Sequence, residues 1–232
     1  MSNVRPHKIM VTKIVNYFHA NFLFEIALRA AKAKSGVQGQ PVVCIVFCAT
    51  ALEAFINECG RLARALPTAK RHKVVDAFAS VMSELEDRRE ALAVKYHLGL
   101  LVFKGASWDE GSQPFQDFKL LIALRNELTH MKGDEWRSEI GRAKPDPERR
   151  AEQYPKFVRE LQNRGVIPKP TKSTSWMEQV SNPAVSAWAC RTASAMTKEF
   201  FASVPDGYFK DSLAEHLLVA SKRKPGTEKR AA

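Results

Sequence analysis

One segment of the sequence, residues 41–65, constrains the fold more than any other. It runs PVVCIVFCATALEAFINECGRLARA, and from Val42 to Phe55 it is apolar on almost every side. Pro41 suits the first turn of an α-helix. A helix without a polar face has to be enclosed by other elements, so we expect this helix to lie at the centre of a helical bundle.

Helical periodicity recurs along the rest of the chain. Four further segments carry apolar or small side chains at helical spacing, namely residues 12–34, 68–97, 115–132 and 182–203. The second of these fits one helix or two, broken near Glu86. No segment has the alternating pattern of a strand, so the sequence predicts an all-α protein with a bundle of about four to six helices.

Local signals indicate where these helices begin and end. Thr12 suits the N-cap of the first helix, and Asn182 suits the N-cap of the last. Gly99 suits the end of a helix that precedes a loop over residues 99–114. Phe22 belongs to the apolar stripe of the first helix and is expected to face the core.

The composition changes after residue 132. Residues 133–175 are polar and contain five prolines. We interpret them as an insertion before the last helix, with one short helix packed loosely on the main body. We expect a single domain over residues 1–204 that includes this insertion. Residues 205–232 end in KRKPGTEKR and are predicted to form a basic C-terminal tail.

The bulk composition indicates an ordinary globular protein, with 45% apolar and 26% charged residues among 232. No apolar run reaches the roughly 18 residues of a membrane helix, and the N-terminus has no apolar signal core. We therefore expect a cytoplasmic protein without a membrane partner. The cysteines are interpreted as buried thiols in a reducing compartment, because no CxxC pair occurs among Cys44, Cys48, Cys59 and Cys190.

The net charge is strongly positive, at +11. Excess positive charge favours polyanions, because phosphate contacts supply most non-specific nucleic-acid binding. Residues 61–73 contain several cations and no acid. The candidate RNA-binding side chains are Arg61, Arg64, Lys70, Arg71, Lys73 and Lys132. The alternative is that these residues belong to ordinary solvated helix faces and loop ends.

A polar stripe interrupts the central apolar helix. Thr50, Glu53 and Asn57 share one helix face by their spacing. A carboxylate inside such a helix is costly unless it is paired, so Glu53 predicts a cationic partner. The sharper hypothesis is that this supporting stripe faces Arg125 or His130. The alternative is a structural salt bridge from Glu53 to any arginine.

The strongest candidates for a chemical role lie in residues 115–132, FQDFKLLIALRNELTHMK. Arg125, Asn126 and His130 lie where its apolar stripe ends. Asn126 and His130 are four residues apart and therefore share a helix face. Arg125 lies on an adjoining face, from which its long side chain can reach the same groove.

RNELTH on a late helix, preceded by an apolar helix of the type ALEAFINE, resembles the HEPN superfamily of all-helical domains. The resemblance covers residues 12–131 and 182–203. It implies a HEPN-like bundle that forms a homodimer, with Arg125 and His130 as catalytic residues and Asn126 as the polar neighbour of the arginine. Many members are metal-independent endoribonucleases, and several are toxins of toxin–antitoxin or phage-defence systems, so an antitoxin protein is a candidate partner.

The side-chain chemistry fits ribonuclease activity independently. Histidine titrates near neutrality and can take the proton from a 2′-hydroxyl. Arginine can stabilise the charge that develops on the phosphate. This reaction requires RNA and leaves a 2′,3′-cyclic phosphate. We expect no cofactor and no metal, because metal-ligand spacing with cysteines or acids is lacking at His7, His19, His72, His97 and His216.

The sequence also allows three alternatives to a ribonuclease. The first is a non-catalytic HEPN-like module that binds RNA or protein. The second is a helical regulator that binds DNA, although no clear helix-turn-helix pattern occurs. The third is purely structural, with Arg125 paired to Glu53 or Glu127 and His130 closing the C-terminal end of its helix.

Overall fold

A computed structural model describes residues 18–33, 39–130, 154–169 and 175–217 of the chain. All regular secondary structure in these described residues is helical, with nine α-helices, one 3₁₀ turn and no strand. The predicted all-α class is confirmed. The helices are more numerous than the predicted four to six, because helices also form over Trp176–Val180 and Tyr208–Leu217, which carried no helical prediction.

The helices follow one another along the described residues. Their bounds are α1 (Ala20–Ala31), α2 (Gln40–Ala65), the 3₁₀ turn η1 (Thr68–Lys70), α3 (Lys73–Asp87), α4 (Leu92–Lys104), α5 (Phe115–Thr129), α7 (Lys156–Asn163), α8 (Trp176–Val180), α9 (Pro183–Ser203) and α10 (Tyr208–Leu217).

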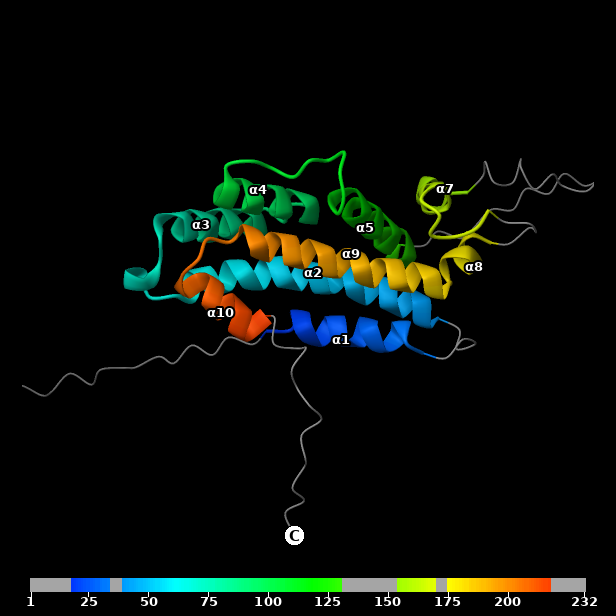
Figure 1. Cartoon of the computed structure of the whole chain (residues 1–232), viewed down its shortest axis with the longest axis horizontal. Coiled ribbons are helices and arrows are strands. Elements are labelled where there is room, and N and C mark those ends of the chain that lie inside the picture. Colours follow the sequence, from blue (N-terminus) through cyan, green and yellow to red (C-terminus); the bar gives the residue numbers. More distant parts are fainter. Residues whose placement is uncertain (1–17, 34–38, 131–153, 170–174, 218–232) are drawn as a thin grey trace, which may run out of the picture.

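Helix α2 is the central element, as its sequence predicts. It contacts α1, α3, α4, α5, α9 and α10, and in Figure 1 it runs alongside α9 with α1 on one side and α3, α4 and α5 on the other. Ile45, Leu52 and Ile56 are among its fully buried side chains. Contrary to the expectation from sequence, α2 is long and apolar enough to cross a membrane by length and composition alone, although 56% of its most apolar window is buried inside the bundle.

Helix α1 begins later than predicted. Phe18 and His19 are not helical, and Thr12 lies outside the described residues. The first turn is closed instead by Glu58 of α2, whose carboxylate accepts hydrogen bonds from the backbone N–H groups of His19 (2.5 Å) and Ala20 (3.2 Å). The expectation for Phe22 is wrong, because this side chain is 61% exposed.

The predicted end of a helix at Gly99 is also wrong. Helix α4 continues to Lys104 and ends at Gly105, which has a positive φ of 70°. Gly99 is buried against the ring of Phe200, and a β-carbon at this position would lie 2.9 Å from that ring. The glycine therefore permits close packing of α4 on α9, and does not terminate the helix.

The two C-terminal predictions differ in outcome. Helix α9 starts as predicted, with the side chain of Asn182 accepting a hydrogen bond from the N–H of Ala184 at 2.8 Å. Helix α10 lies within the segment expected to be a tail, and it buries Phe209 and Leu213. The packed part of the chain therefore extends well beyond residue 204.

Helix α7 comes from the segment interpreted as an insertion. It buries Phe157, Val158 and Leu161, and it packs against both α5 and α8. This part of the segment therefore contributes side chains to the core and contacts the main body through α5. Residues 131–153 and 170–174 of the same segment lie outside the described residues.

Candidate functional site

Arg125 and Glu53 meet between α5 and α2. The Nη2 atom of Arg125 lies 3.3 Å from Oε2 of Glu53, and the two side chains are 24% and 44% exposed. The prediction that Glu53 faces a cation of the 115–132 helix is confirmed, with Arg125 as the partner. A half-exposed pair of this kind orients the guanidinium more than it stabilises the fold.

The guanidinium of Arg125 has hydrogen-bonding capacity left. It carries five N–H donors, and among the described residues only Nη2 has a hydrogen-bond partner. The Nε atom is buried and has no partner among the described residues, so only the terminal nitrogens can meet an anionic group that approaches from solvent.

His130 closes helix α5. Its backbone N–H donates to the carbonyl of Asn126 at 3.0 Å, and its side chain is exposed. Within the part of the chain that the structure describes, no hydrogen bond or ion pair engages the imidazole. The exposed side chain of Asn126 lies one turn earlier.

Helix geometry sets how these three side chains diverge. An α-helix turns about 100° per residue, so Asn126 and His130 lie about 40° apart around the axis, and Arg125 and His130 about 140° apart. Asn126 and His130 thus share the solvent face of α5, while Arg125 is directed towards α2. The arrangement also contains both features of the purely structural alternative, a pair between Arg125 and Glu53 and a helix that ends at His130.

The rest of the polar stripe on α2 serves other partners. The hydroxyl of Thr50 donates to the carbonyl of Val46 in its own helix, at 2.9 Å. The side-chain oxygen of Asn57 accepts from the buried ammonium of Lys95 on α4, at 2.8 Å. Of the three supporting residues, only Glu53 reaches the Arg125 side of α5.

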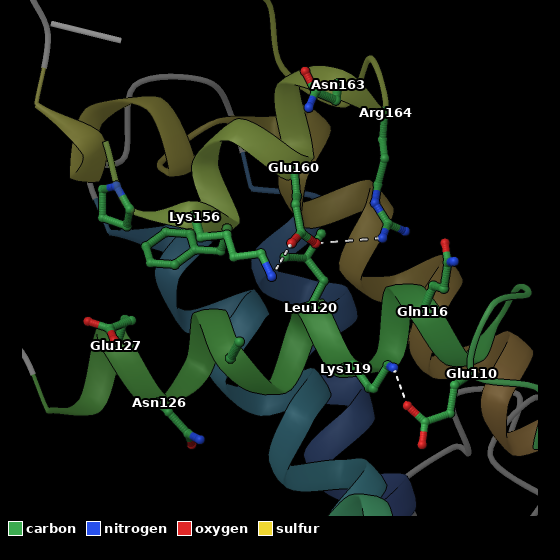
Figure 2. Close-up of a pocket in the computed structure, with 13 residues that line it drawn as sticks. Glu110, Gln116, Lys119, Leu120, Asn126, Glu127, Lys156, Glu160, Asn163 and Arg164 are labelled. Atoms are coloured by element: carbon green, nitrogen blue, oxygen red, sulfur yellow. Dashed lines mark hydrogen bonds and ion pairs between the residues drawn. The ribbon is translucent and has the colours of Figure 1, made fainter. Parts of the chain in front are cut away.

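A groove of about 910 Å³ lies between α5 and α7. Figure 2 shows Glu127 on the α7 side of α5, with the amide of Asn126 on the opposite side. The groove is lined by Glu110, Gln116, Lys119, Leu120, Ala123, Asn126, Glu127, Pro155, Lys156, Phe157, Glu160, Asn163 and Arg164. It therefore borders the candidate site without containing His130 or Arg125.

The cations of the groove are paired with acids. Lys119 lies 2.8 Å from Glu110, and Arg164 forms an ion pair with Asp117 that joins α7 to α5. The carboxylate of Glu160 forms ion pairs with Lys156 and with Arg164, each at 3.7 Å (Figure 2). The groove is consequently mixed in charge, and by itself it does not favour an anionic ligand.

The cations of segment 61–73 are partly paired within the chain. Arg61 and Arg64 both pair with Glu86, at 2.9 and 3.6 Å, and the hydrogen bond from Arg61 lowers the pKa of that carboxyl. Arg71 pairs with Asp76 at 3.0 Å, and the ammonium of Lys70 lies 4.3 Å from the ring centre of Tyr208.

The position of this basic segment also separates it from the candidate catalytic residues. It connects α2 to α3 at one end of the molecule, whereas α5 ends towards the other (Figure 1). Lys73 begins α3 and is exposed. Lys132 lies outside the described residues. The predicted RNA-binding residues therefore do not surround the Arg125–His130 region as one patch.

The sequence did not predict two polar contacts near the candidate site. The buried Lys95 that holds Asn57 had a signal, because a lysine between Val94 and Tyr96 in a strongly apolar helix demands a buried acceptor. The ion pair between Arg164 and Asp117 had no signal in the sequence, because 47 residues separate the two side chains.

No protein family model, curated protein or solved structure matches this chain.

Proposed function

We propose that the protein is a metal-independent endoribonuclease with a HEPN-like bundle, in which Arg125, Asn126 and His130 act on RNA. The observation that supports this most is at the end of α5. An exposed imidazole and an exposed amide share one helix face there, next to a guanidinium that Glu53 orients from the neighbouring helix. A base and an anion-stabilising donor are the two groups that the reaction needs.

The proposed reaction is an internal transesterification of RNA. The imidazole of His130 removes the proton from a 2′-hydroxyl, and the resulting oxygen attacks the adjacent phosphorus. The bond from phosphorus to the 5′-oxygen breaks, which leaves a 2′,3′-cyclic phosphate and a 5′-hydroxyl. Arg125 stabilises the additional negative charge on the phosphate oxygens, and Asn126 positions the nucleotide by hydrogen bonding.

The 140° divergence between Arg125 and His130 favours an assembly of two chains. In a homodimer that pairs the exposed ends of α5, the His130 of a second chain would protonate the leaving 5′-oxygen. We propose this dimer as the active form in the cytoplasm. The role as a toxin or phage-defence component, with an antitoxin protein as partner, belongs to the same proposal.

Cleavage without divalent metal tests the proposal directly. We expect the purified full chain to cut RNA in the presence of EDTA and to leave cyclic phosphate ends. His130→Ala should reduce the rate by about 10²- to 10⁴-fold, the usual contribution of a general base. Its thermal unfolding should be unchanged, because the side chain is exposed. Rates and mapped RNA ends are the measurements.

A matched control is available in His19→Ala. The side chain of His19 is also exposed, and the residue precedes α1. Helix α1 lies on the opposite side of α2 from α5 (Figure 1). This variant should keep the cleavage rate of the unchanged protein. Equal cleavage by His130→Ala, or activity that disappears in EDTA, would falsify the proposal.

A second candidate function is a non-catalytic module that binds RNA or protein through the same surface. The pairing of Arg125 with Glu53 favours it, since a paired guanidinium has less charge to offer a transition state. This candidate requires salt-sensitive RNA binding without scission. Binding and cleavage measured on the same RNA separate the two functions.

A further inference from the structure

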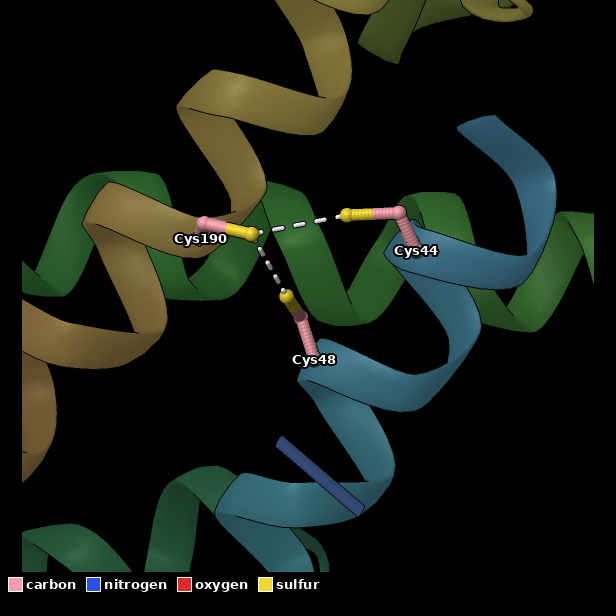
Figure 3. A group of neighbouring side chains, drawn as sticks. All are labelled: Cys44, Cys48 and Cys190. Atoms are coloured by element: carbon pink, nitrogen blue, oxygen red, sulfur yellow. Dashed lines mark hydrogen bonds between the residues drawn. The ribbon is translucent and has the colours of Figure 1, made fainter. Parts of the chain in front are cut away.

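Three cysteine side chains converge between α2 and α9. Cys44 and Cys48 lie one turn apart on α2, and Cys190 approaches them from α9 (Figure 3). The Sγ atom of Cys190 is 3.5 Å from that of Cys44 and 3.7 Å from that of Cys48. All three sulfur atoms lie within 4.8 Å of one another.

These separations match those of sulfur ligands around one metal ion. A Zn–S bond is about 2.3 Å, which places sulfurs about 3.8 Å apart in a tetrahedral site and about 4.0 Å apart in a trigonal one. The three thiols thus need only small side-chain adjustments to reach a common centre. Two ligands from one helix turn and a third from a neighbouring helix would cross-link α2 to α9.

The surroundings of the cluster suit a soft cation. Cys44 and Cys48 are fully buried, whereas Cys190 is partly exposed and gives access from solvent. Thiolates select soft ions such as Zn²⁺ and Cu⁺. Among the described residues, no histidine or carboxylate joins the group. Zn²⁺ would then need a water as its fourth ligand, whereas Cu⁺ is satisfied by three sulfurs.

Hydrogen bonds already hold the three thiols together. The Sγ atom of Cys190 shares one hydrogen bond with Sγ of Cys44 and accepts another from Sγ of Cys48. A metal ion would displace the protons of these thiols, as binding to thiols always requires.

We propose that Cys44, Cys48 and Cys190 bind one thiophilic cation, Zn²⁺ or Cu⁺, which clamps α9 to the central helix. This inference is independent of the ribonuclease proposal, because no cysteine takes part in that reaction. The expectation from sequence that the chain binds no metal is revised by this proposal.

The test uses the full chain, reduced and freed of metal. Zn²⁺ and Cu⁺ are titrated separately in competition with a coloured chelator, and the number of bound ions is counted by native mass spectrometry. We expect one ion per chain, a rise in the melting temperature, and protection of Cys190, the partly exposed thiol of the cluster, from a thiol reagent. The arm that gives the tighter binding identifies the ion.

Two variants make the test specific. Loss of a residue that supports a metal ligand typically weakens metal binding 10- to 100-fold. Cys190→Ala removes a ligand itself, so it should weaken binding by about 10²-fold or more. Cys59→Ala is the matched control, because Cys59 lies on α2, is fully buried and stands outside the cluster. It should bind the ion as the unchanged chain does. Circular dichroism verifies that each variant is folded.

Three results would overturn the proposal. The first is no stoichiometric uptake of either ion by the reduced, folded chain. The second is equal binding by Cys190→Ala and the unchanged chain. The third is a loss of binding in Cys59→Ala as large as in Cys190→Ala, both variants being folded, which would place the ion elsewhere.

Discussion

The carboxylate of Glu58 takes the place of a local helix cap. It belongs to α2, is 6% exposed, and receives the first N–H groups of α1. Unpaired N–H groups at the start of a helix need an acceptor, and the side chain of His19 does not supply one. Burial raises the pKa of Glu58, and the two backbone hydrogen bonds oppose this shift.

This residue gives a pH-dependent prediction. Because the pKa of Glu58 is higher in the folded chain than in the unfolded chain, its contribution to stability is greatest below the unfolded value of about 4.3 and is lost as the pH rises through the folded pKa. In Glu58→Gln this dependence should disappear. Urea unfolding of both chains on either side of that range measures the difference, and parallel pH profiles would contradict the assignment.

The pair of Arg125 with Glu53 gives a prediction that separates orientation from stability. Glu53→Gln should cost only about 0.2–1 kcal/mol of unfolding free energy, because exposed pairs contribute little. If Glu53 orients the guanidinium, kcat for RNA cleavage should fall while KM changes little. Glu25→Gln, which breaks the exposed pair with Arg29 on α1, is the control. Equal kinetics in both variants would remove the orienting role.

At the scale of elements, α9 is the helix whose local signals are most complete. Asn182 caps it, Pro183 occupies its first turn, and its middle carries the third cysteine of the cluster. An N-cap side chain satisfies one of the backbone donors that have no partner within the helix.

Removal of this cap should therefore be measurable. Asn182→Ala is expected to lower the unfolding free energy by about 1 kcal/mol, within a range of about 0.5–2. Asn182→Asp keeps an acceptor at the same position and should retain most of the stability. Chemical denaturation measures both, and an alanine variant as stable as the aspartate variant would show that the cap contributes nothing.

At the scale of the whole molecule, the charge of +11 is spread over surfaces where several cations already have partners. Glu86 pairs with both Arg61 and Arg64. These arginines remain exposed, so they can exchange this partner for a phosphate. Any RNA affinity of the chain should fall with salt, because counterions are released on binding.

The double change Arg61→Ala with Arg64→Ala tests this surface. If both arginines contact phosphates of single-stranded RNA, the slope of log K against log salt should become shallower by about 1.4. Arg29→Ala with Lys198→Ala removes two exposed cations elsewhere and is the control. Fluorescence anisotropy at several salt concentrations gives the slopes. An identical slope in the two double variants would exclude residues 61–73 as the RNA surface.

The sequence was a good guide wherever one helix decides the outcome. The apolar run from Val42 to Phe55 required enclosure, and α2 is central. The pattern of one polar residue inside an apolar helix also led from Glu53 to a cation on α5. The prediction of a helix end at Gly99 failed, because a glycine that ends a helix and a glycine that admits a neighbouring ring look alike in sequence.

The main helices and the cap at Asn182 follow from the sequence itself, because periodicity and capping depend on residues a few positions apart. Tertiary structure alone decided that Cys190 meets Cys44 across 146 residues, and that Glu58 closes α1. It also decided that Arg125 faces α2 while His130 faces solvent. The physical reason is that such contacts depend on how the helices pack against one another, which no local spacing encodes.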